Sequence, residues 1–446
     1  MEDEATARGA RGMLARPPLR GTSLEAYRHE RTWTLTANTA YAVMGGGFVA
    51  VVADKVWAVH PAVLAVIIAV PMCANLSGVL WTRLAHGRRK VPFLAAMTAA
   101  SIAVTAAVAF APPGPWGAAL LVGSVVVANV ALSGIIAIRS TVWSLNYDRA
   151  VRARVTGRFN VMTTAVIMAV ALVGSLLMDR DAESFRAIYL ATAALGVAGV
   201  ASIARVPVLG EAGQLALERG EHEDAEGDGT HQGMWALLRQ DPDYARYQGW
   251  QFVLGVSNMM IEAPLVYLIS NQLQASYLVS IGLVTVVPMA LATVTLPVWA
   301  HYLDRVHIVE FRTRQAAFWV VSQAATWLGA LTGSLLLVGA GRFVLGLARG
   351  GGSLAWNLGH NDFASQQNLA AYMGLHVTLT GLRGLFAPFV GMLLFVGWAE
   401  HTLPWVGATL PAFEGIGAGT FAISCALSTI AGLGYLSLWR HLQPGP

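Results

Sequence analysis

Residues 59–81 read VHPAVLAVIIAVPMCANLSGVLW, and residues 278–299 read LVSIGLVTVVPMALATVTLPVW. Both stretches are almost wholly apolar, and each carries a Val-Pro-Met tripeptide, at Val70–Met72 and at Val287–Met289. A tryptophan follows the first proline after ten residues and the second proline after eleven. A helix needs about 20 such residues to cross the hydrocarbon core of a bilayer. The pair therefore predicts two membrane-spanning helices at corresponding positions of an internal repeat.

The composition places the rest of the chain in a membrane as well. Only 12% of the 446 residues are charged and 55% are hydrophobic, whereas a typical soluble domain has roughly 25% charged residues. The mean hydropathy is +0.55. The pI near 9.2 would suit a nucleic-acid surface, but the basic residues are spread over short loops. We therefore expect the lipid bilayer, and no nucleic acid, as a partner.

Twelve apolar stretches are candidate spans, six before the most polar part of the chain and six after it. They predict an all-α polytopic membrane protein, with twelve transmembrane helices in two pseudo-symmetric six-helix bundles. The expected spans are residues 33–53, 59–82, 91–111, 117–138, 161–178, 187–206, 248–269, 278–299, 316–332, 335–358, 373–397 and 416–439.

The polar stretch, residues 207–247, is rich in Asp, Glu and Gly, a composition that cannot bury a core. It predicts a cytoplasmic linker, and the apolar cluster near its end predicts a short surface helix within 234–247. The expected domains are a cytoplasmic N-terminal segment (1–32), an N-terminal six-helix bundle (33–206), the linker (207–247), a C-terminal six-helix bundle (248–439) and a cytoplasmic tail (440–446).

Lys and Arg set the expected orientation, because positive residues resist translocation across the membrane. If both termini are cytoplasmic, most loop arginines fall inside, including those at 83, 88, 89, 152 and 305. Few basic residues, such as Lys55, Arg180 and Arg186, then lie near the outer face. We expect an integral, multi-pass protein of the inner (cytoplasmic) membrane with both termini cytoplasmic.

The internal repeat extends beyond the two proline-containing spans. A Trp followed by an Asp comes after spans four and ten, as Trp143…Asp148 and Trp356…Asp362, and the offset between the halves stays near 213 to 218 residues. Parallel six-helix repeats joined by a long cytoplasmic connection resemble the major facilitator superfamily. The resemblance implies a transporter whose two bundles rock around a central site.

The loop after span two is similar to the loop signature of that superfamily, which has a Gly, an Asp-Arg pair, and a Gly followed by two basic residues. The acidic member is absent from this loop, and the matching loop of the second half keeps the Asp-Arg pair without the glycines. The resemblance implies gating loops that contain Gly78, Arg83, Gly87, Arg88, Arg89, Asp304 and Arg305.

Ionisable side chains inside a span are functional candidates, because each costs about 2.5–3.5 kcal/mol at a helix centre on insertion scales. Glu262 is the only acid well inside a predicted span. Arg349 lies inside span ten, whereas Arg342 is buried only if the preceding turn falls at 332–334 rather than near Gly339. An ion pair between Glu262 and one of these arginines is feasible. It would be either a proton-carrying pair that contacts the substrate or a permanent structural salt bridge.

Span eleven adds Arg383 near its middle and His376 nearer its cytoplasmic end. Three arginines against one carboxylate favour an anionic or zwitterionic substrate, because charge in a low-dielectric cavity needs compensation. Asparagines on other spans could line the same cavity. The expected substrate or coupling residues are Glu262, Arg342, Arg349, Arg383, His376, Asn258, Asn38 and Asn357.

Two further polar groups have simpler interpretations. Arg139, at the exit of span four, is expected to be a cytoplasmic anchor or else to reach the floor of the cavity. The cluster of His360, Asp362 and neighbouring asparagines with His376 could ligate a divalent metal, but polar capping at a helix end accounts for it better, and we expect no metal.

The sequence thus predicts a monomeric carrier of a small solute that works by alternating access, either proton-coupled or facilitative. The alternative is a non-transporting membrane protein of the same fold, such as an assembly or lipid-handling factor. Phosphate-cradling loops, metal-ligand spacings and nucleophile elbows are missing from convincing contexts, so neither an enzyme nor a cofactor is expected.

Overall fold

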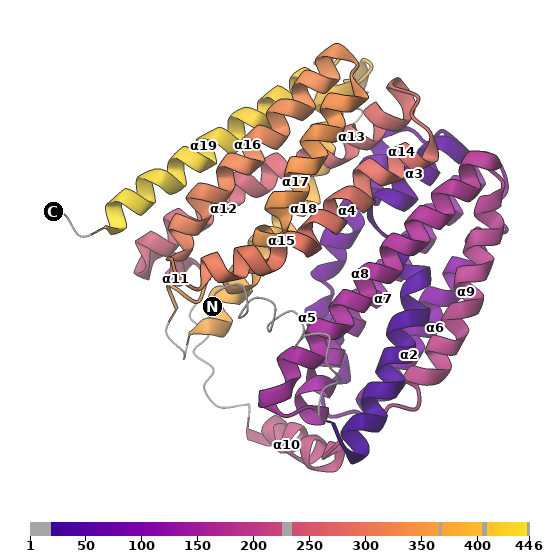
Figure 1. Ribbon diagram of the computed structural model, residues 1–446, viewed down its shortest axis with the longest axis vertical. Coiled ribbons are helices and arrows are strands. Elements are labelled where there is room, and N and C mark those ends of the chain that lie inside the picture. Colours follow the sequence, from indigo (N-terminus) through magenta and orange to yellow (C-terminus); the bar gives the residue numbers. More distant parts are fainter. Residues whose placement is uncertain (1–18, 225–233, 365–367, 404–407, 444–446) are drawn as a thin grey trace, which may run out of the picture. The chain divides into compact units, whose positions relative to one another are not determined.

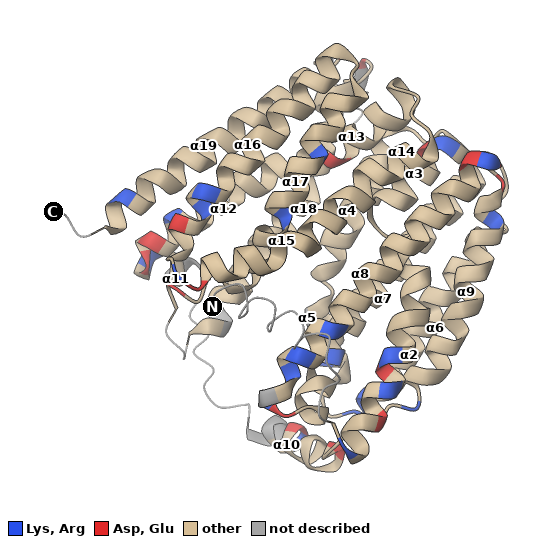
Figure 2. Ribbon diagram, viewed as in Figure 1, with Lys and Arg blue, Asp and Glu red and all other residues tan. Residues whose placement is uncertain are grey.

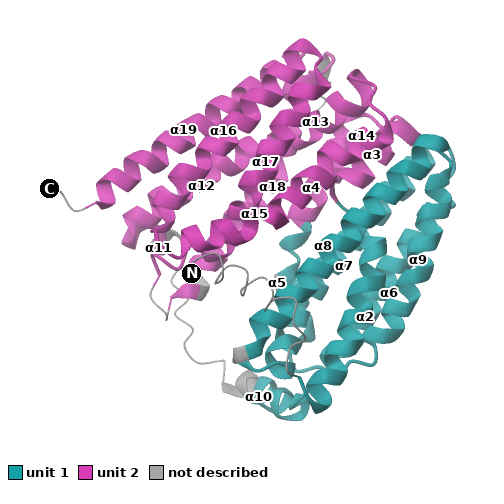
Figure 3. Cartoon of the chain, in the orientation of Figure 1, with its two compact units in different colours: residues 1–45, 74–230 teal, residues 46–73, 231–446 magenta. Residues whose placement is uncertain are grey.

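A computed structural model describes residues 19–224, 234–364, 368–403 and 408–443. The chain forms two compact units, coloured separately in Figure 3. Unit 1 comprises Met1–Gly45 and Ala74–Thr230, and unit 2 comprises Gly46–Cys73 and His231–Pro446. The segment Gly46–Cys73, from the first two predicted spans, therefore packs with the second half of the chain. The domain boundaries drawn from the sequence stay a prediction.

Unit 1 is built of long helices that pack side by side (Figure 1). Its helix α2 ends at Met44, and Gly46, two residues later, takes the positive φ (56°) that favours glycine. The helices are α2 (Gly21–Met44), α5 (Gly78–Ala85), α6 (Lys90–Val108), α7 (Pro115–Asn146), α8 (Arg149–Arg180), α9 (Ser184–Ile203) and α10 (Glu211–Asp224).

Unit 2 contains the remaining helices, two π-helical turns (η1, η2) and a two-stranded antiparallel hairpin that the all-α expectation did not include. Its elements are α3 (Gly46–Trp57), α4 (Pro61–Asn75), α11 (Met234–Gln240), α12 (Pro242–Met260), α13 (Glu262–Tyr267), η1 (Leu268–Gln272), α14 (Tyr277–Ile281), η2 (Gly282–Val286), α15 (Val287–Leu303), α16 (Ile308–Thr332), α17 (Leu335–Leu358), α18 (Leu369–Val396), β1 (His401–Leu403), β2 (Ala408–Leu410) and α19 (Gly419–Leu442). The short surface helix expected before span seven is α11.

Nine helical segments of the described chain are long and apolar enough to cross a membrane, and the bent pair α2–α3 makes a tenth. The two other predicted spans correspond to α4, which has only 15 residues, and to α16. Helix α16 contains the buried amides Gln315 and Gln323, which lower its hydropathy but bond to partners inside the bundle. The protein is an all-α, multi-span membrane protein.

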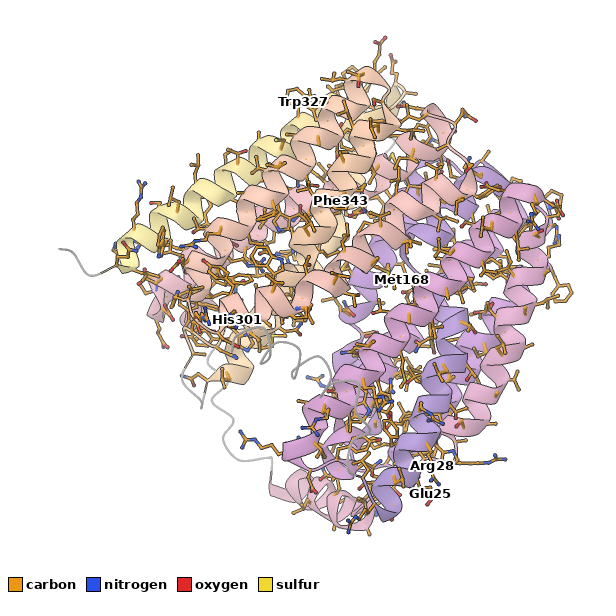
Figure 4. The ribbon with its side chains drawn as sticks, viewed as in Figure 1. Glu25, Arg28, Met168, His301, Trp327 and Phe343 are labelled. Atoms are coloured by element: carbon orange, nitrogen blue, oxygen red, sulfur yellow. The ribbon has the colours of Figure 1, made fainter. Side chains whose placement is uncertain are left out.

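The distribution of side chains suits a bilayer. Lys, Arg, Asp and Glu gather towards helix ends in each unit (Figure 2), and the exposed Glu25 and Arg28 lie at one end of α2 (Figure 4). Large apolar side chains are exposed in the middle of helices, for example Phe343 at 50% and Val294 at 72%. In water such side chains would be a liability, whereas lipid chains solvate them.

A close backbone contact joins α12 to α18 inside unit 2. Helix α12 ends at Met260, and a Cβ added to Gly391 would lie only 1.7 Å from the carbonyl oxygen of Met260. Only a glycine at position 391 allows the two backbones to come so close. The contact lies where Pro264, which has no N–H to offer the Met260 carbonyl oxygen four residues earlier, interrupts span seven directly before Glu262.

We expect Gly391→Ala to destabilise the protein, because overpacking against backbone atoms costs about 1–3 kcal/mol or more. The measurement is the thermal unfolding of the purified protein in detergent. Gly374→Ala on the same helix is the matched control, since a Cβ there meets no atom within 4 Å. Equal unfolding temperatures of the two variants would contradict the proposed role of the contact.

Candidate functional site

The position of Arg342 is set by the turn between α16 and α17. Gly333 ends α16 in the left-handed conformation (φ 66°), and the Ser334 hydroxyl accepts the N–H of Leu337 at the start of α17. This is a helix stop followed at once by an N-cap. Helix α17 therefore begins at Leu335, and Arg342 lies about two turns inside it. Its side chain is 1% exposed, as the earlier of the two possible turns requires.

The Arg342 guanidinium group has three described partners in unit 2. Its Nε and Nη2 donate to the carbonyl oxygens of Leu283 and Val284, each at 3.1 Å, and its Nη1 lies 3.5 Å from Oε1 of Glu262. Both carbonyl groups belong to the π-helical turn η2, which departs from α-helical hydrogen bonding. Arg342 thus ties α17 to η2 and to α13, and Glu262 pairs with Arg342.

Glu262 is the looser partner of this pair. It opens α13 directly after the break at Ile261, and its side chain is 28% exposed. The 3.5 Å separation exceeds the 2.7–2.9 Å of a strong charge-assisted hydrogen bond. Because two carbonyl groups also bind Arg342, the carboxylate can be released without leaving the guanidinium group unpartnered. The geometry permits a proton or a solute to compete for Glu262.

A second buried acid, Asp54, lies in the same unit and was missed at the level of sequence. It is on α3 and 5% exposed, and it accepts a hydrogen bond from the hydroxyl of Ser270 in η1. Ser270 also contacts the carbonyl oxygen of Val266 at 2.7 Å. The predicted first span stopped at residue 53, one residue short of this acid. Extending the span to Trp57, where α3 ends, would have found it.

Asn258 belongs to a buried polar network one turn before Glu262. Its Oδ1 accepts from Gln323 Nε2 at 2.7 Å, and Gln323 also bonds to Ser257 and Ser424. These residues come from α12, α16 and α19. The network satisfies polar groups inside unit 2 and links the start of the broken span to two neighbouring helices.

The other predicted substrate residues are not joined to Glu262 by any described hydrogen bond or ion pair. Arg349 and Asn357 are exposed on α17, and Asn357 donates to the carbonyl oxygen of Ser353. Arg383 and His376 are buried on α18, where they contact Gln251 and Gln248 of α12.

Two polar residues of unit 1 are buried and bonded. Asn38 donates to Thr34 and to Thr163. Arg139 was expected to be a cytoplasmic anchor, with the cavity floor as the alternative, and its side chain is buried inside unit 1. It is 7% exposed and pairs with the fully buried Glu30 at 2.9 Å, with its guanidinium group 4.3 Å from the Trp33 ring centroid. Glu30 lies just before the first predicted span, so its carboxylate was not considered as a partner.

In unit 1, the first gating loop is held by helix α10 of the linker. Glu218 of α10 is 7% exposed, and its Oε2 accepts from the backbone N–H of Gly87 and from Lys90 Nζ, both at 2.6 Å. Its backbone carbonyl oxygen lies 2.8 Å from His86 Nε2. A cavity of about 140 Å³ adjoins this contact, lined by Thr82, Ala85, His86, Lys90, Ile138, Thr141 and Glu218. The linker therefore contains a helix that buries one of its acids against the loop.

The remaining gating residues lie at helix ends. Arg89 pairs with Glu211 of α10 at 3.1 Å, and Arg219 of α10 donates to the carbonyl oxygen of Gly87. Gly78 is half-buried at the start of α5, and four charged members of the predicted set are exposed: Arg83, Arg88, Asp304 and Arg305. The loop after span two lacks the acidic residue of the superfamily's signature, and Glu218 of α10 places a carboxylate beside this loop.

The electrostatics of Glu218 favour its charged form. Burial by itself would raise the pKa of the carboxyl, but hydrogen bonds from Lys90, Gln214 and Gly87 outweigh burial and hold the pKa below its ordinary value of 4.5. A lowered pKa means that docking of α10 is fully stabilised above pH 4.5 and weakens as the pH falls through the pKa of the docked state.

Membrane-spanning helices with ionisable side chains inside them are typical of polytopic membrane transporters. A family model described as Major Facilitator Superfamily matches residues 34–388. The chain belongs to this superfamily, and it is a transporter of small solutes. A comparison with curated protein sequences found no match.

Solved structures of transporters share the fold across nearly the whole chain. The nucleoside transporter NupG is 14% identical, with a TM-score of 0.66, over 94% of this chain and 100% of that one. An inward open conformation of the xylose transporter XylE from E. coli is 11% identical, with a TM-score of 0.62, over 94% and 95%. A D-xylose–proton symporter is 12% identical, with a TM-score of 0.65, over 94% and 97%. At such identities the likeness concerns the fold alone.

We expect Glu218→Gln to release α10 from the loop, because it removes a charge that faces the nearly buried Lys90. Amide hydrogen exchange at pH 7 should become at least tenfold faster within residues 211–224. The wild-type protein should approach the same behaviour below pH 4.5, where the carboxyl takes up a proton.

The control is Glu183→Gln, which breaks an exposed ion pair with Arg186 in the same unit. It should leave exchange in α10 unchanged. If Glu218→Gln also leaves it unchanged, Glu218 does not hold the linker helix.

Proposed function

We propose that the protein is a secondary carrier that moves a small polar solute by alternating access, with Glu262 as the proton-carrying group and Arg342 as its fixed partner. The observation that carries this proposal is the asymmetry of the pair. Arg342 is buried and bound by two backbone carbonyl groups, whereas Glu262 is partly exposed and held only at 3.5 Å. One partner stays fixed while the other can change its protonation state.

The coupling step follows from this geometry. A charged Glu262 is attracted to Arg342, and a protonated Glu262 loses most of that attraction. Protonation therefore weakens the link between α13 and α17 while the contacts of Arg342 with η2 persist. Asp54 gives unit 2 a second acid, on α3, where it receives the Ser270 hydroxyl. Two acids near the broken span support proton coupling.

The charge balance supports an anionic or zwitterionic solute. Among the described residues of unit 2, Arg349 forms no ion pair, so its positive charge is available to an anionic or zwitterionic solute. The transporters with the same fold carry a nucleoside or xylose according to their names. Both are small hydroxylated solutes, which widens the candidates to polar solutes of that size. We further propose an inner-membrane location with both termini in the cytoplasm, and a monomer.

The test is uptake into proteoliposomes of labelled nucleosides, pentoses, amino acids and hydroxy acids, with and without an inward proton gradient. We expect at least one class to accumulate, and accumulation to rise about tenfold or more with the gradient. Glu262→Gln should abolish gradient-driven accumulation but keep solute exchange, because exchange requires no change in protonation.

Glu400→Gln is the matched control, since Glu400 is exposed in the same unit, and it should behave like the wild-type protein. Full accumulation by Glu262→Gln would make the Glu262–Arg342 pair structural only. Absence of transport for every class would contradict the assignment of a carrier for such solutes.

A further inference from the structure

A cluster of hydrogen-bond donors is buried in unit 2, away from the Glu262–Arg342 pair. It is formed by α12, α16, α18 and α19 with the residues that follow α17. Six polar atoms there are fully buried and have no hydrogen-bond partner among the described residues. They are Tyr247 Oη, Gln248 Nε2, Arg312 Nε, His360 Nδ1, His376 Nε2 and Arg383 Nε, and we call them the donor cluster. Buried polar atoms are nearly always partnered, so such a concentration needs an explanation.

The cluster contains two buried guanidinium groups without an ion pair. Arg312 is 3% exposed and Arg383 is 4% exposed. Arg312 donates to Gln315 Oε1 at 2.8 Å. Arg383 donates to the carbonyl oxygen of Gln251 at 2.8 Å and to Thr380 Oγ1 at 3.0 Å. In the part of the chain that the structure describes, no carboxylate lies within 4.0 Å of either.

Both arginines converge on the same pair of tyrosines. The rings of Tyr247 and Tyr435 are 5.9 Å apart, and both tyrosines interact electrostatically with Arg312 and Arg383. The Tyr247 hydroxyl also faces Arg312, so these two groups partly satisfy each other, but a neutral hydroxyl does not compensate the charge. Tyr435 Oη donates to Oε1 of Gln251, the residue whose backbone carbonyl receives Arg383. The unpartnered donors of α12, α16 and α18 therefore lie around one small region.

The charges of this region do not balance. Among the described acids, Asp362 interacts electrostatically with Tyr247. Its Oδ2 accepts a hydrogen bond from the N–H of Ile308 at 2.7 Å. Two arginines against one carboxylate leave one positive charge in excess. Uncompensated charge inside a protein is costly, because a buried ion loses its hydration without gaining a partner of opposite charge.

The hydrogen-bonding atoms and the charge of the donor cluster indicate which kind of ligand is missing. Both arginine atoms and Gln248 Nε2 can only donate, and Tyr247 Oη and His360 Nδ1 can donate too, so their partner must be an acceptor. His376 Nε2 donates only in the protonated ring, because His376 Nδ1 gives its proton to Gln248 Oε1. A water molecule would satisfy two or so of these atoms but would leave the charge uncompensated. A single negative charge would compensate it. The surrounding core of aromatic side chains, including Tyr244, Phe311 and Tyr372, favours a small and weakly hydrated ion.

We propose that the donor cluster of unit 2 is a binding site for one monovalent halide-class anion, with chloride as the natural occupant. This anion is a resident ligand and not the transported solute. The site does not depend on the proposed function, because binding can be measured without transport. The bound anion would accept hydrogen bonds from α12, α16 and α18 together, and would therefore stabilise the packing of these helices.

The first test is the thermal unfolding of the full-length protein in detergent, at pH 7 and constant ionic strength. Chloride or bromide replaces gluconate in steps. We expect a saturable rise in unfolding temperature with chloride and bromide, and a weaker rise with phosphate. Arg312→Gln should weaken the apparent halide affinity at least tenfold. Arg314→Gln is the matched control, because Arg314 lies on the same helix, is 60% exposed and pairs with Glu310.

The second test uses the wild-type protein alone, in case Arg312→Gln does not fold. A crystal grown in bromide should give an anomalous peak within hydrogen-bond distance of Arg312 and Arg383. The proposal is overturned if halides do not stabilise the protein, or if phosphate stabilises it and halides do not. It is also overturned if Arg312→Gln leaves the halide affinity unchanged, or if bromide is found only elsewhere in the crystal.

Discussion

The contacts of Arg342 hold together the part of unit 2 on which the candidate site depends. No water is available inside a bilayer to satisfy polar groups, so each charged side chain and each departure from helical hydrogen bonding needs a protein partner. Arg342 and the turn η2 supply each other with that partner. The break at Ile261 follows from Pro264, which has no N–H for the Met260 carbonyl group, and Gly391 leaves room for α18 beside that carbonyl group. Glu262 is then presented at the start of a new helix rather than within a continuous one.

The two units treat buried charge differently. In unit 1, Arg139 has Glu30 and Lys90 has Glu218, so each described buried cation has a carboxylate beside it. In unit 2, Arg342 has a loose carboxylate, whereas Arg312 and Arg383 have only neutral partners. A closed ion pair fixes helices in place, whereas an incompletely compensated charge responds to protons and ions. The chemistry that can change state is therefore concentrated in unit 2.

Much of this arrangement could be predicted from local sequence, and the rest depends on contacts between distant residues. Apolar runs and the repeated Val-Pro-Met segments predicted the multi-span helical fold. The Glu262–Arg342 pair was predicted as one of two choices, and the turn at Gly333 and Ser334 decided between them. Glu218 could not be predicted, because it lies in a segment whose acidic composition is typical of a solvated linker, and its partners are more than a hundred residues away. Asp54 was missed because apolar runs locate the ends of spans only to within a few residues.

The grouping of Gly46–Cys73 with the second half of the chain has a consequence for biogenesis. Gly47 packs so closely on Val284 that a Cβ would lie 2.2 Å from its side chain, so this segment reaches its native contacts only after η2 has been synthesised. At translation rates of about 5–20 residues per second, the wait is on the order of ten seconds or more. During that interval the insertion machinery or lipid must shelter α3 and α4. The two halves of the chain therefore do not fold one after the other as independent units. The first spans reach their native packing only after the second half of the chain has been synthesised.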